Sequence, residues 1–259
     1  MPGRGAGRTN QGVGGTNQSL GQTNQGLGGT NQGVGGRGVV LINPNTSVST
    51  TAMMTAVARR TLGPAVPVQG VTVERGPRML TEPAALRAAA PEVVAAGRRA
   101  LAAGDGAALI VAAFGDPGLD DLRALAGGGV PVVGIGEAAL LEASAGGTPF
   151  GIATTTPLLA DSIADQVARL GLTHLFTGLR LTQGAPEKLA ARPESLRESL
   201  ALAGERCVLR DGARAIVIAG GPLSDAAESL RPDFDVPLIA PIPAACRLVT
   251  RLTATPSGA

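Results

Sequence analysis

No tryptophan or tyrosine occurs in this chain of 259 residues, which holds only four phenylalanines, one histidine and two cysteines. So few aromatic rings leave little surface on which nucleic acid bases could stack. The one histidine, His174, excludes metal centres with several histidine ligands and argues against a Ser-His-Asp triad. The cysteines, Cys207 and Cys246, are too few for a four-thiolate zinc site or a disulfide framework. Composition leaves open an α/β protein that handles a small molecule.

The chain also lacks an excess of charge of either sign. It has 22 basic residues against 20 acidic residues, a formal net charge of +2. Three of the arginines (Arg4, Arg8 and Arg37) lie in the first 38 residues, where there is no acidic residue. The remaining 221 residues therefore carry 19 basic and 20 acidic groups, which argues against nucleic acid or an anionic membrane as a partner.

The N-terminal segment is rich in glycine and repeats with a period of seven residues. Residues 9–36 read TNQGVGG, TNQSLGQ, TNQGLGG and TNQGVGG, with one apolar residue in each repeat. Because this pattern can bury almost nothing, we expect residues 1–38 to form a disordered tail, not a coiled coil. Translated repeat DNA upstream of a working start near Val39 is the alternative.

Long apolar runs are missing as well. No apolar region follows Arg4 and Arg8, as a signal peptide would require. The longest later run, Ala107–Phe114, is far shorter than the roughly 20 residues that span a bilayer. We therefore expect a cytoplasmic protein without a membrane partner.

After residue 38, short apolar segments alternate with helical patterns. Continuous apolar strands that alternate with helices are typical of parallel sheets covered by helices on both faces. The expected helices include Pro91–Ala103, Leu158–Leu170 and Glu194–Leu209. The expected strands are Val39–Ile42, Val66–Val73, Leu109–Ala112, Val130–Ile135, Phe150–Ala153, Ala215–Ala219 and Val236–Ile239.

Four of these strands run directly into residues that start helices. Helices that begin there point their free N–H groups at the carboxyl edge of the sheet, where open α/β sheets bind ligands. These junctions predict a site for a small anionic or carbonyl-rich molecule. Their sequences are NPNTS after Ile42, FGDPG after Ala113, TTTP after Ala153 and GGPL after Ala219.

The order of these features repeats along the chain. In each half a capped strand is followed by a long crossover, a glycine-rich strand end and a strand that begins with proline. This repetition indicates two pseudo-symmetric α/β lobes, each with a mainly parallel sheet, and a ligand cleft between them. The expected boundaries are 39–137 with 244–259 for the first lobe and 138–243 for the second.

Six segments together resemble the hydantoin/allantoin racemase branch of the Asp/Glu racemase superfamily, over about residues 39–250. The resemblance implies two α/β lobes, no cofactor, a hydantoin-, allantoin- or amino-acid-type substrate held between the lobes, and homo-oligomers. The segments are INPNTS (42–47), ERGPR (74–78), AAFGDPGL (112–119), PVVGIGEAA (131–139), IATTTPL (152–158) and IAGGPL (218–223).

The two cysteines that act as opposed bases in this family are missing. In the family one cysteine precedes FGDPGL and the other ends the later strand, and the resemblance places Ala113 and Gly220 at these positions. Neither residue can accept a proton, so the two-thiol mechanism is absent. We expect Cys207 and Cys246 to be buried structural thiols.

Other residues could replace these bases or bind the substrate. Glu137 and Asp116 are the candidate catalytic acids or bases, although Asp116 can also cap the helix that Pro117 begins. His174 and Asp225 are expected to have structural roles. The candidate substrate-binding residues are Asn45, Thr46, Ser47, Phe114, Gly115, Thr154, Thr155, Gly220 and Gly221.

Three functions remain open for this pocket. The first is a racemase or isomerase that uses Glu137 or Asp116 as a non-thiol base. The second is a different carbonyl reaction in the same cleft, such as decarboxylation or hydrolysis. The third is a non-catalytic protein that binds a small anion. Deuterium exchange into a substrate separates the first from the third, and the mass of the product identifies the second.

Overall fold

The computed structural model describes residues 38–104 and 106–254, which belong to one compact unit. The tail expected for residues 1–38 lies, except for Gly38, outside the described residues. Among the helices that are described, none combines the length and the apolar character that crossing a membrane requires.

Within residues 38–104 and 106–254, eight strands form two separate sheets of four strands, and every pairing there is parallel. The strand orders are β2-β1-β3-β4 and β6-β5-β7-β8, so both sheets have the same topology, as the repeated sequence features predict. The first sheet contains β1 (Gly38–Asn43), β2 (Val68–Thr72), β3 (Gly106–Val111) and β4 (Val132–Gly134). The second contains β5 (Phe150–Thr154), β6 (Phe176–Leu181), β7 (Ala215–Ile218) and β8 (Leu238–Ile239).

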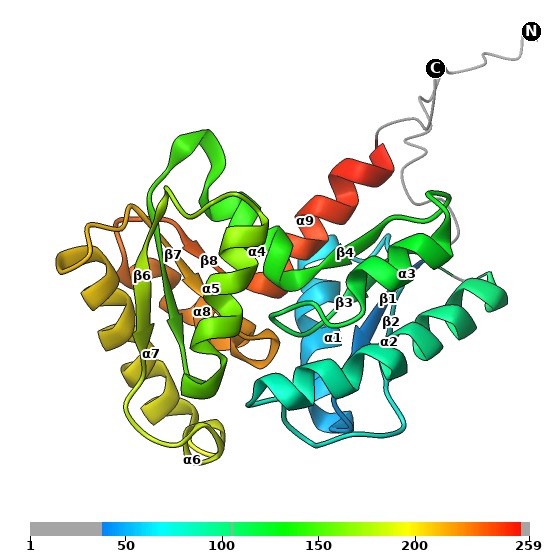
Figure 1. The fold of residues 1–259 in the computed structure, drawn as a ribbon, viewed down its shortest axis with the longest axis horizontal. Helices are drawn as coiled ribbons and strands as arrows, with labels where there is room; N and C mark the ends of the chain where they lie inside the picture. The colour runs from blue at the N-terminus through cyan, green and yellow to red at the C-terminus, as the bar shows by residue number, and fades with distance from the viewer. Residues whose placement is uncertain (1–37, 105, 255–259) are drawn as a thin grey trace, which may run out of the picture. The chain divides into compact units, whose positions relative to one another are not determined.

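Helices connect the strands and cover both sheets (Figure 1). The first half contains α1 (Val48–Leu62), α2 (Pro83–Ala103), α3 (Leu119–Ala126) and α4 (Ile135–Ala143). The second half contains α5 (Ala160–Arg169), α6 (Pro186–Ala190), α7 (Pro193–Leu209), α8 (Ser224–Leu230) and α9 (Pro241–Ala254). Short 3₁₀ helices are η1 (Ala145–Gly147), η2 (Pro157–Leu159), η3 (Gly221–Leu223) and η4 (Arg231–Asp233).

Alternate residues of each strand face opposite sides of its sheet, so each sheet contributes to two cores. In β1, Val40 and Ile42 pack with residues of α2 and α3. Val39 and Leu41 belong to a larger cluster that also contains residues of α1, α4, α9 and the second sheet. The outer face of the second sheet packs against α7 and α8. Both sheets are therefore buried on both faces, which explains their continuous apolar strands.

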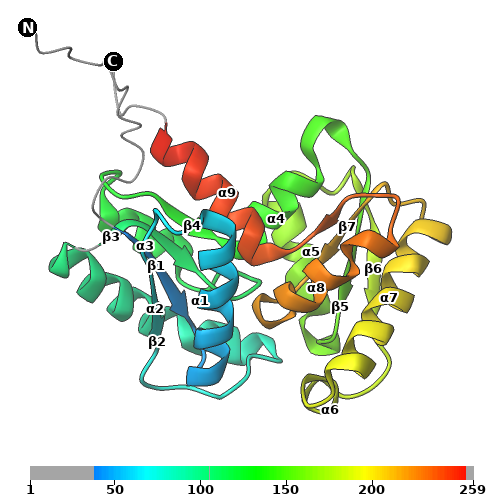
Figure 2. The same ribbon diagram turned by 180° about the vertical axis from the view of Figure 1, so that it is seen from behind.

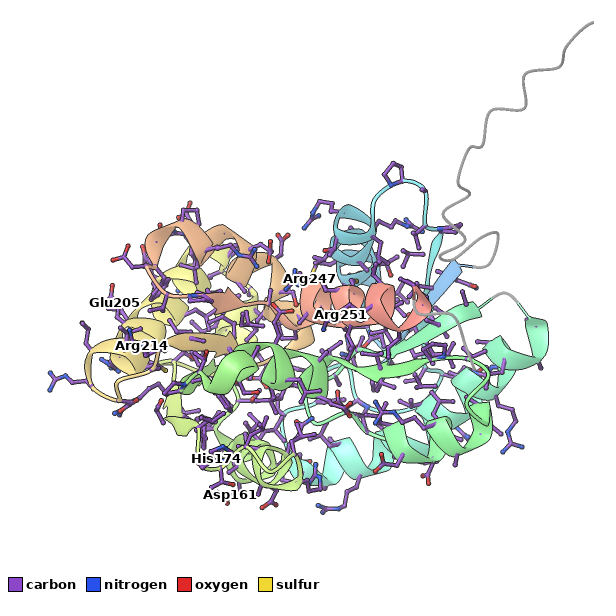
Figure 3. The ribbon with its side chains drawn as sticks, turned by 90° about the horizontal axis from the view of Figure 1, so that it is seen from above. Asp161, His174, Glu205, Arg214, Arg247 and Arg251 are labelled. Atoms are coloured by element: carbon purple, nitrogen blue, oxygen red, sulfur yellow. The ribbon has the colours of Figure 1, made fainter. Side chains whose placement is uncertain are left out.

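Helices α4 and α9 join the two lobes. Figure 2 shows α9 next to α1, and Figure 3 shows it from above with Arg247 and Arg251 along it. Arg247 donates hydrogen bonds of 2.9 and 2.6 Å to Glu142 of α4. Arg60 of α1 pairs with Asp225 of α8 at 2.5 Å. Both side chains of the Arg60 pair are exposed, so buried apolar packing contributes more to the junction than this pair does.

The structure departs from the expected elements at β6, at the start of α2 and at the end of the expected strand Val130–Ile135, where Ile135 instead begins α4. Strand β6 was not expected; its residues are only half-buried, because it lies at a sheet edge and its sequence FTGLRL mixes polar and apolar residues. Helix α2 begins at Pro83 and continues through Pro91, which we expected to start the helix. The lobe boundaries given above remain a prediction.

Candidate functional site

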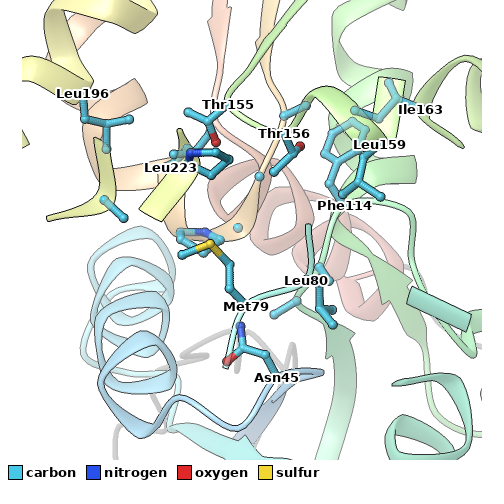
Figure 4. A pocket seen from close by; sticks show the side chains of 18 residues that line it. Asn45, Met79, Leu80, Phe114, Thr155, Thr156, Leu159, Ile163, Leu196 and Leu223 are labelled. Atoms are coloured by element: carbon cyan, nitrogen blue, oxygen red, sulfur yellow. The ribbon is translucent and has the colours of Figure 1, made fainter. Parts of the chain in front are cut away.

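A cavity of about 100 Å³ opens where the carboxyl ends of both sheets meet (Figure 4). Its lining comes from the loops that follow β1, β3, β5 and β7, together with residues near β2, α5, α6 and α7. These are the strand ends at which the sequence predicts a ligand site. The lining residues are Asn45, Met79, Leu80, Ala112, Ala113, Phe114, Thr155, Thr156, Leu159, Ile163, Pro186, Ala190, Leu196, Ala219, Gly220, Gly221, Pro222 and Leu223.

Asn45 is held in place by its own loop. Its Oδ1 accepts hydrogen bonds from Asn43 Nδ2 and from the main-chain nitrogen of Ser47, both at 2.9 Å. These contacts leave its amide N–H groups for a ligand, and Figure 4 shows the amide nitrogen directed toward Met79 and the pocket. The amide of Asn45 is therefore a fixed hydrogen-bond donor.

The neighbouring predicted residues support this loop from outside the lining. Ser47 is the N-cap of α1 and accepts a hydrogen bond from Thr50 N at 3.3 Å. Thr46 donates from its main chain to Pro77 and so ties the loop to the segment that carries Met79. The structure thus gives Thr46 and Ser47 capping and loop contacts, while Asn45 faces the cavity.

Of the two threonines predicted to bind substrate in the second lobe, Thr154 has a structural contact and Thr155 lines the cavity. Thr154 is fully buried, and its hydroxyl donates 2.9 Å to the carbonyl oxygen of Ala219, joining the ends of β5 and β7. Thr155 lines the cavity, and so does Thr156, which sequence reasoning missed. The polar run Thr154–Thr156 was the only signal that could have identified it.

Gly220 and Gly221 form the wall that comes from β7. Gly220 has a φ of 152°, a backbone conformation that L side chains rarely adopt. A Cβ at Gly221 would lie 2.8 Å from the carbonyl oxygen of Ala112 and 2.8 Å from Met54 Sδ. The close approach of these loops explains why glycine occupies position 221.

The remaining walls are mostly apolar. Phe114, Leu159 and Ile163 lie together on one side, and Leu196 and Leu223 line another part of the cavity (Figure 4). None of the 18 lining residues has a carboxyl, imidazole, thiol, amino, phenol or guanidinium group. Ala113 and Gly220 are both among the lining residues. These are the two positions at which the family resemblance predicts cysteines.

Asp116, a predicted catalytic residue, lies behind this lining and is almost fully buried. Its carboxylate accepts hydrogen bonds from Gly136 N at 2.9 Å, Glu137 N at 2.7 Å and Gln166 Nε2 at 2.6 Å. Burial raises the pKa of Asp116 to about 7, although the hydrogen bonds from Gly136 and Glu137 oppose this rise. The neighbouring Glu137 charge raises the pKa further.

We expected Asp116 to cap the helix that Pro117 begins, and this prediction is wrong. Helix α3 begins at Leu119 with Gly118 as its N-cap and has no side-chain cap. Asp116 instead caps the first turn of α4, twenty residues later in the chain. The sequence could not show this contact because it depends on how β3 and β4 pair.

Glu137, the other predicted catalytic residue, is bound by an arginine. Arg123 of α3 donates two hydrogen bonds to its carboxylate, at 3.0 and 2.9 Å. Glu137 lies in the first turn of α4 and outside the cavity lining. Gly115 also lies outside the lining, between Phe114 and Asp116.

The two thiols and the imidazole lie away from the cavity. Cys207 and Cys246 are both buried, as expected, and burial raises the pKa of each thiol to about 12. His174 is exposed, with its Nδ1 3.1 Å from the carbonyl oxygen of Gly171. Within residues 38–104 and 106–254 there is no group of three or more side chains that could hold a metal ion.

Comparisons with known proteins identify the family. The family model described as "Asp/Glu/Hydantoin racemase" matches residues 39–249. The chain belongs to the Asp/Glu/hydantoin racemase family.

Members of the family resemble the chain over most of its length. The hydantoin racemase of Paenarthrobacter aurescens is 27% identical over 216 residues, which are 83% of this chain and 91% of that protein. Allantoin racemase from Klebsiella pneumoniae superposes with a TM-score of 0.77 at 26% identity, covering 86% of this chain and 95% of that one. For allantoin racemase from Pseudomonas fluorescens the TM-score is 0.74 at 25% identity, with 85% and 97% covered. These comparisons confirm the resemblance and the fold class, and the chain is racemase-like.

Proposed function

We propose that this chain binds a hydantoin-, allantoin- or amino-acid-type molecule in the cavity between its lobes and does not racemise it by two protein bases. The observation that carries the proposal is the absence of any titratable side chain among the 18 lining residues. Racemisation by two bases needs one proton acceptor and one proton donor on opposite faces of the substrate Cα. By the family resemblance, Ala113 and Gly220 occupy the positions of the two cysteines; they follow strands of different sheets, and both line the cavity.

The cavity retains the means to recognise carbonyl oxygens. Asn45 offers its amide N–H groups, and Thr155 and Thr156 offer hydroxyl groups. No lysine or arginine is part of the lining, so neutral carbonyl groups suit it better than a fully charged carboxylate. The apolar walls would surround an apolar ring substituent.

Two measurements on the same sample test this proposal. We expect L-5-substituted hydantoins to raise the melting temperature of the wild type, which reports binding. In D₂O, proton NMR is expected to show loss of the Cα proton at the rate of a protein-free control. Exchange faster than that control would show that the chain has a working base, and no binding of any test compound would refute the binding role.

A slow one-base exchange is a second candidate function, supported by the pKa of Asp116. A carboxyl with a pKa of about 7 is suited to gaining and losing a proton near neutral pH. Asp116 is also joined to the lining, because its main-chain nitrogen donates to the carbonyl oxygen of Ala113 at 3.0 Å. If Asp116 is the base, Asp116→Asn abolishes an exchange that Glu137→Gln leaves measurable.

A further inference from the structure

We propose that the hydrogen bond between Gln166 and Asp116 is a latch between the two lobes that sets the width of the cavity. Asp116 follows β3 of the first sheet, and Gln166 lies on α5, which follows β5 of the second sheet. Gln166 Nε2 donates to Asp116 Oδ2 at 2.6 Å, and both side chains are buried. For its effect on ligand affinity, the inference rests on the binding function proposed above.

Both partners of this hydrogen bond are directly connected to one wall of the cavity. Leu159, Ile163 and Gln166 are spaced by four and three residues, so they share one face of the helical segment. On the other partner's side, Phe114 precedes Asp116 by two residues. Phe114, Leu159 and Ile163 form the apolar wall in Figure 4. The bond therefore fixes how closely α5 approaches the loop after β3.

Two glycines leave room for this latch. A Cβ at Gly134 would lie 2.2 Å from the Asp116 carboxyl carbon, and a Cβ at Gly136 would lie 2.6 Å from Gln166 Nε2. The sequence Gly134-Ile135-Gly136 thus forms a slot for a carboxylate and an amide. This close approach explains why both positions are glycine.

The amide of Gln166 has one polar anchor in the described part of the chain. Its Oε1 is buried and has no hydrogen-bond partner among the described residues. An apolar side chain of similar length would avoid that unpaired acceptor, so core packing alone does not explain a glutamine here. Its contact with Asp116 does, and the same carboxylate also holds the first turn of α4.

The test measures the distance between the lobes directly and needs no ligand. Spin labels would be attached at Leu125→Cys on α3 and Leu209→Cys on α7, both exposed positions. The native thiols are buried, so labels react at the introduced sites. In Gln166→Met we expect a longer and broader inter-label distance distribution than in the wild type. Gln69→Met, which changes an exposed glutamine of β2, is the matched control.

Ligand affinity gives the second readout. A hydantoin that binds the wild type is expected to bind Gln166→Met about tenfold more weakly, because the hydrogen bond between Gln166 and Asp116 no longer holds the cavity at its width. About tenfold corresponds to the loss of one hydrogen bond to a charged group. An unchanged distance distribution in a folded Gln166→Met variant would overturn the latch. If no hydantoin binds the wild type, the proposed function fails, while the label distances still decide whether the latch exists.

A second variant keeps the test decisive if Gln166→Met does not fold. Gln166→Glu has the same shape, and at acid pH a proton shared with Asp116 restores the hydrogen bond. At pH of about 8 both carboxylates ionise and repel, so the inter-label distance should lengthen. Glu137 of α4 and Arg123 of α3 are the charged groups that act on Asp116. A distance that changes with pH no more than in the wild type would refute the latch.

Discussion

A Cβ atom at Gly221 would lie 2.8 Å from the carbonyl oxygen of Ala112, so the loops after β7 and β3 meet main chain to main chain. This contact joins the two lobes at the cavity lining, next to Ala113 and Gly220. A side chain larger than hydrogen has to push these loops apart.

Gly221→Ala is therefore expected to destabilise the fold by about 1–3 kcal/mol and to weaken ligand binding. Urea unfolding and calorimetric titration measure the two effects. Gly129→Ala is the matched control, because a Cβ there would meet its nearest neighbour, the carbonyl oxygen of Ala126, at an ordinary 3.7 Å. Equal stability of the two variants would mean that the loops are free to separate.

The two positions without cysteine should differ in their tolerance of one. Gly220 has a φ of 152°, and a Cβ there would lie 3.0 Å from Leu223 Cδ1. Ala113 already has a Cβ and is not among the non-glycine residues with positive φ. We expect Gly220→Cys to lose about 1–3 kcal/mol of unfolding free energy through backbone strain. Ala113→Cys should lose much less; urea unfolding of both variants checks this difference.

Asp116 predicts a specific dependence of stability on pH. Its pKa is about 7 in the folded chain and 3.8 in the unfolded reference, so between these values the folded state binds more protons. The stabilising contribution is present below the lower pKa and is lost as pH rises to the higher one. The unfolding free energy should fall with a slope of up to about 1.4 kcal/mol per pH unit.

Asp116→Asn removes this titration while keeping the size of the side chain. The difference between the wild-type and variant slopes, measured by urea unfolding from pH 4 to pH 8, isolates Asp116 from other groups. A wild-type slope that matches the variant throughout would show that Asp116 has an ordinary pKa.

The native thiols are expected to be unreactive. Cys207 and Cys246 are buried, and burial raises the pKa of both to about 12, so almost no thiolate forms at neutral pH. A disulfide reagent should label neither cysteine in the folded chain and both in denaturant. Rapid labelling of either one without denaturant would show that a thiol is accessible for chemistry.

The sequence allowed the fold to be predicted because its buried strands are continuous apolar runs that end in helix-starting residues. The sequence did not predict strand β6, because half-buried edge strands lack that pattern. The approach of Ala113 and Gly220 to one cavity followed from the family motifs and from the rule that parallel strands end at one edge.

Contacts between distant side chains could not be read in the same way. Gln166 was not singled out, because a lone glutamine in an amphipathic helix has no distinctive pattern. The partners of Asp116 lie twenty, twenty-one and fifty residues away, and only the packing of α4 and α5 brings them together.

The central claim is that the cavity has no working acid or base. Its most direct test is to introduce such a group by mutation. Cα proton exchange of an L-5-substituted hydantoin in D₂O would be followed by NMR with the wild type, Ala113→Cys and Leu209→Cys, whose thiol is exposed outside the cavity. We predict that only Ala113→Cys exceeds the protein-free rate, because position 113 lines the cavity and position 209 does not. A wild-type rate above the protein-free control would contradict the claim.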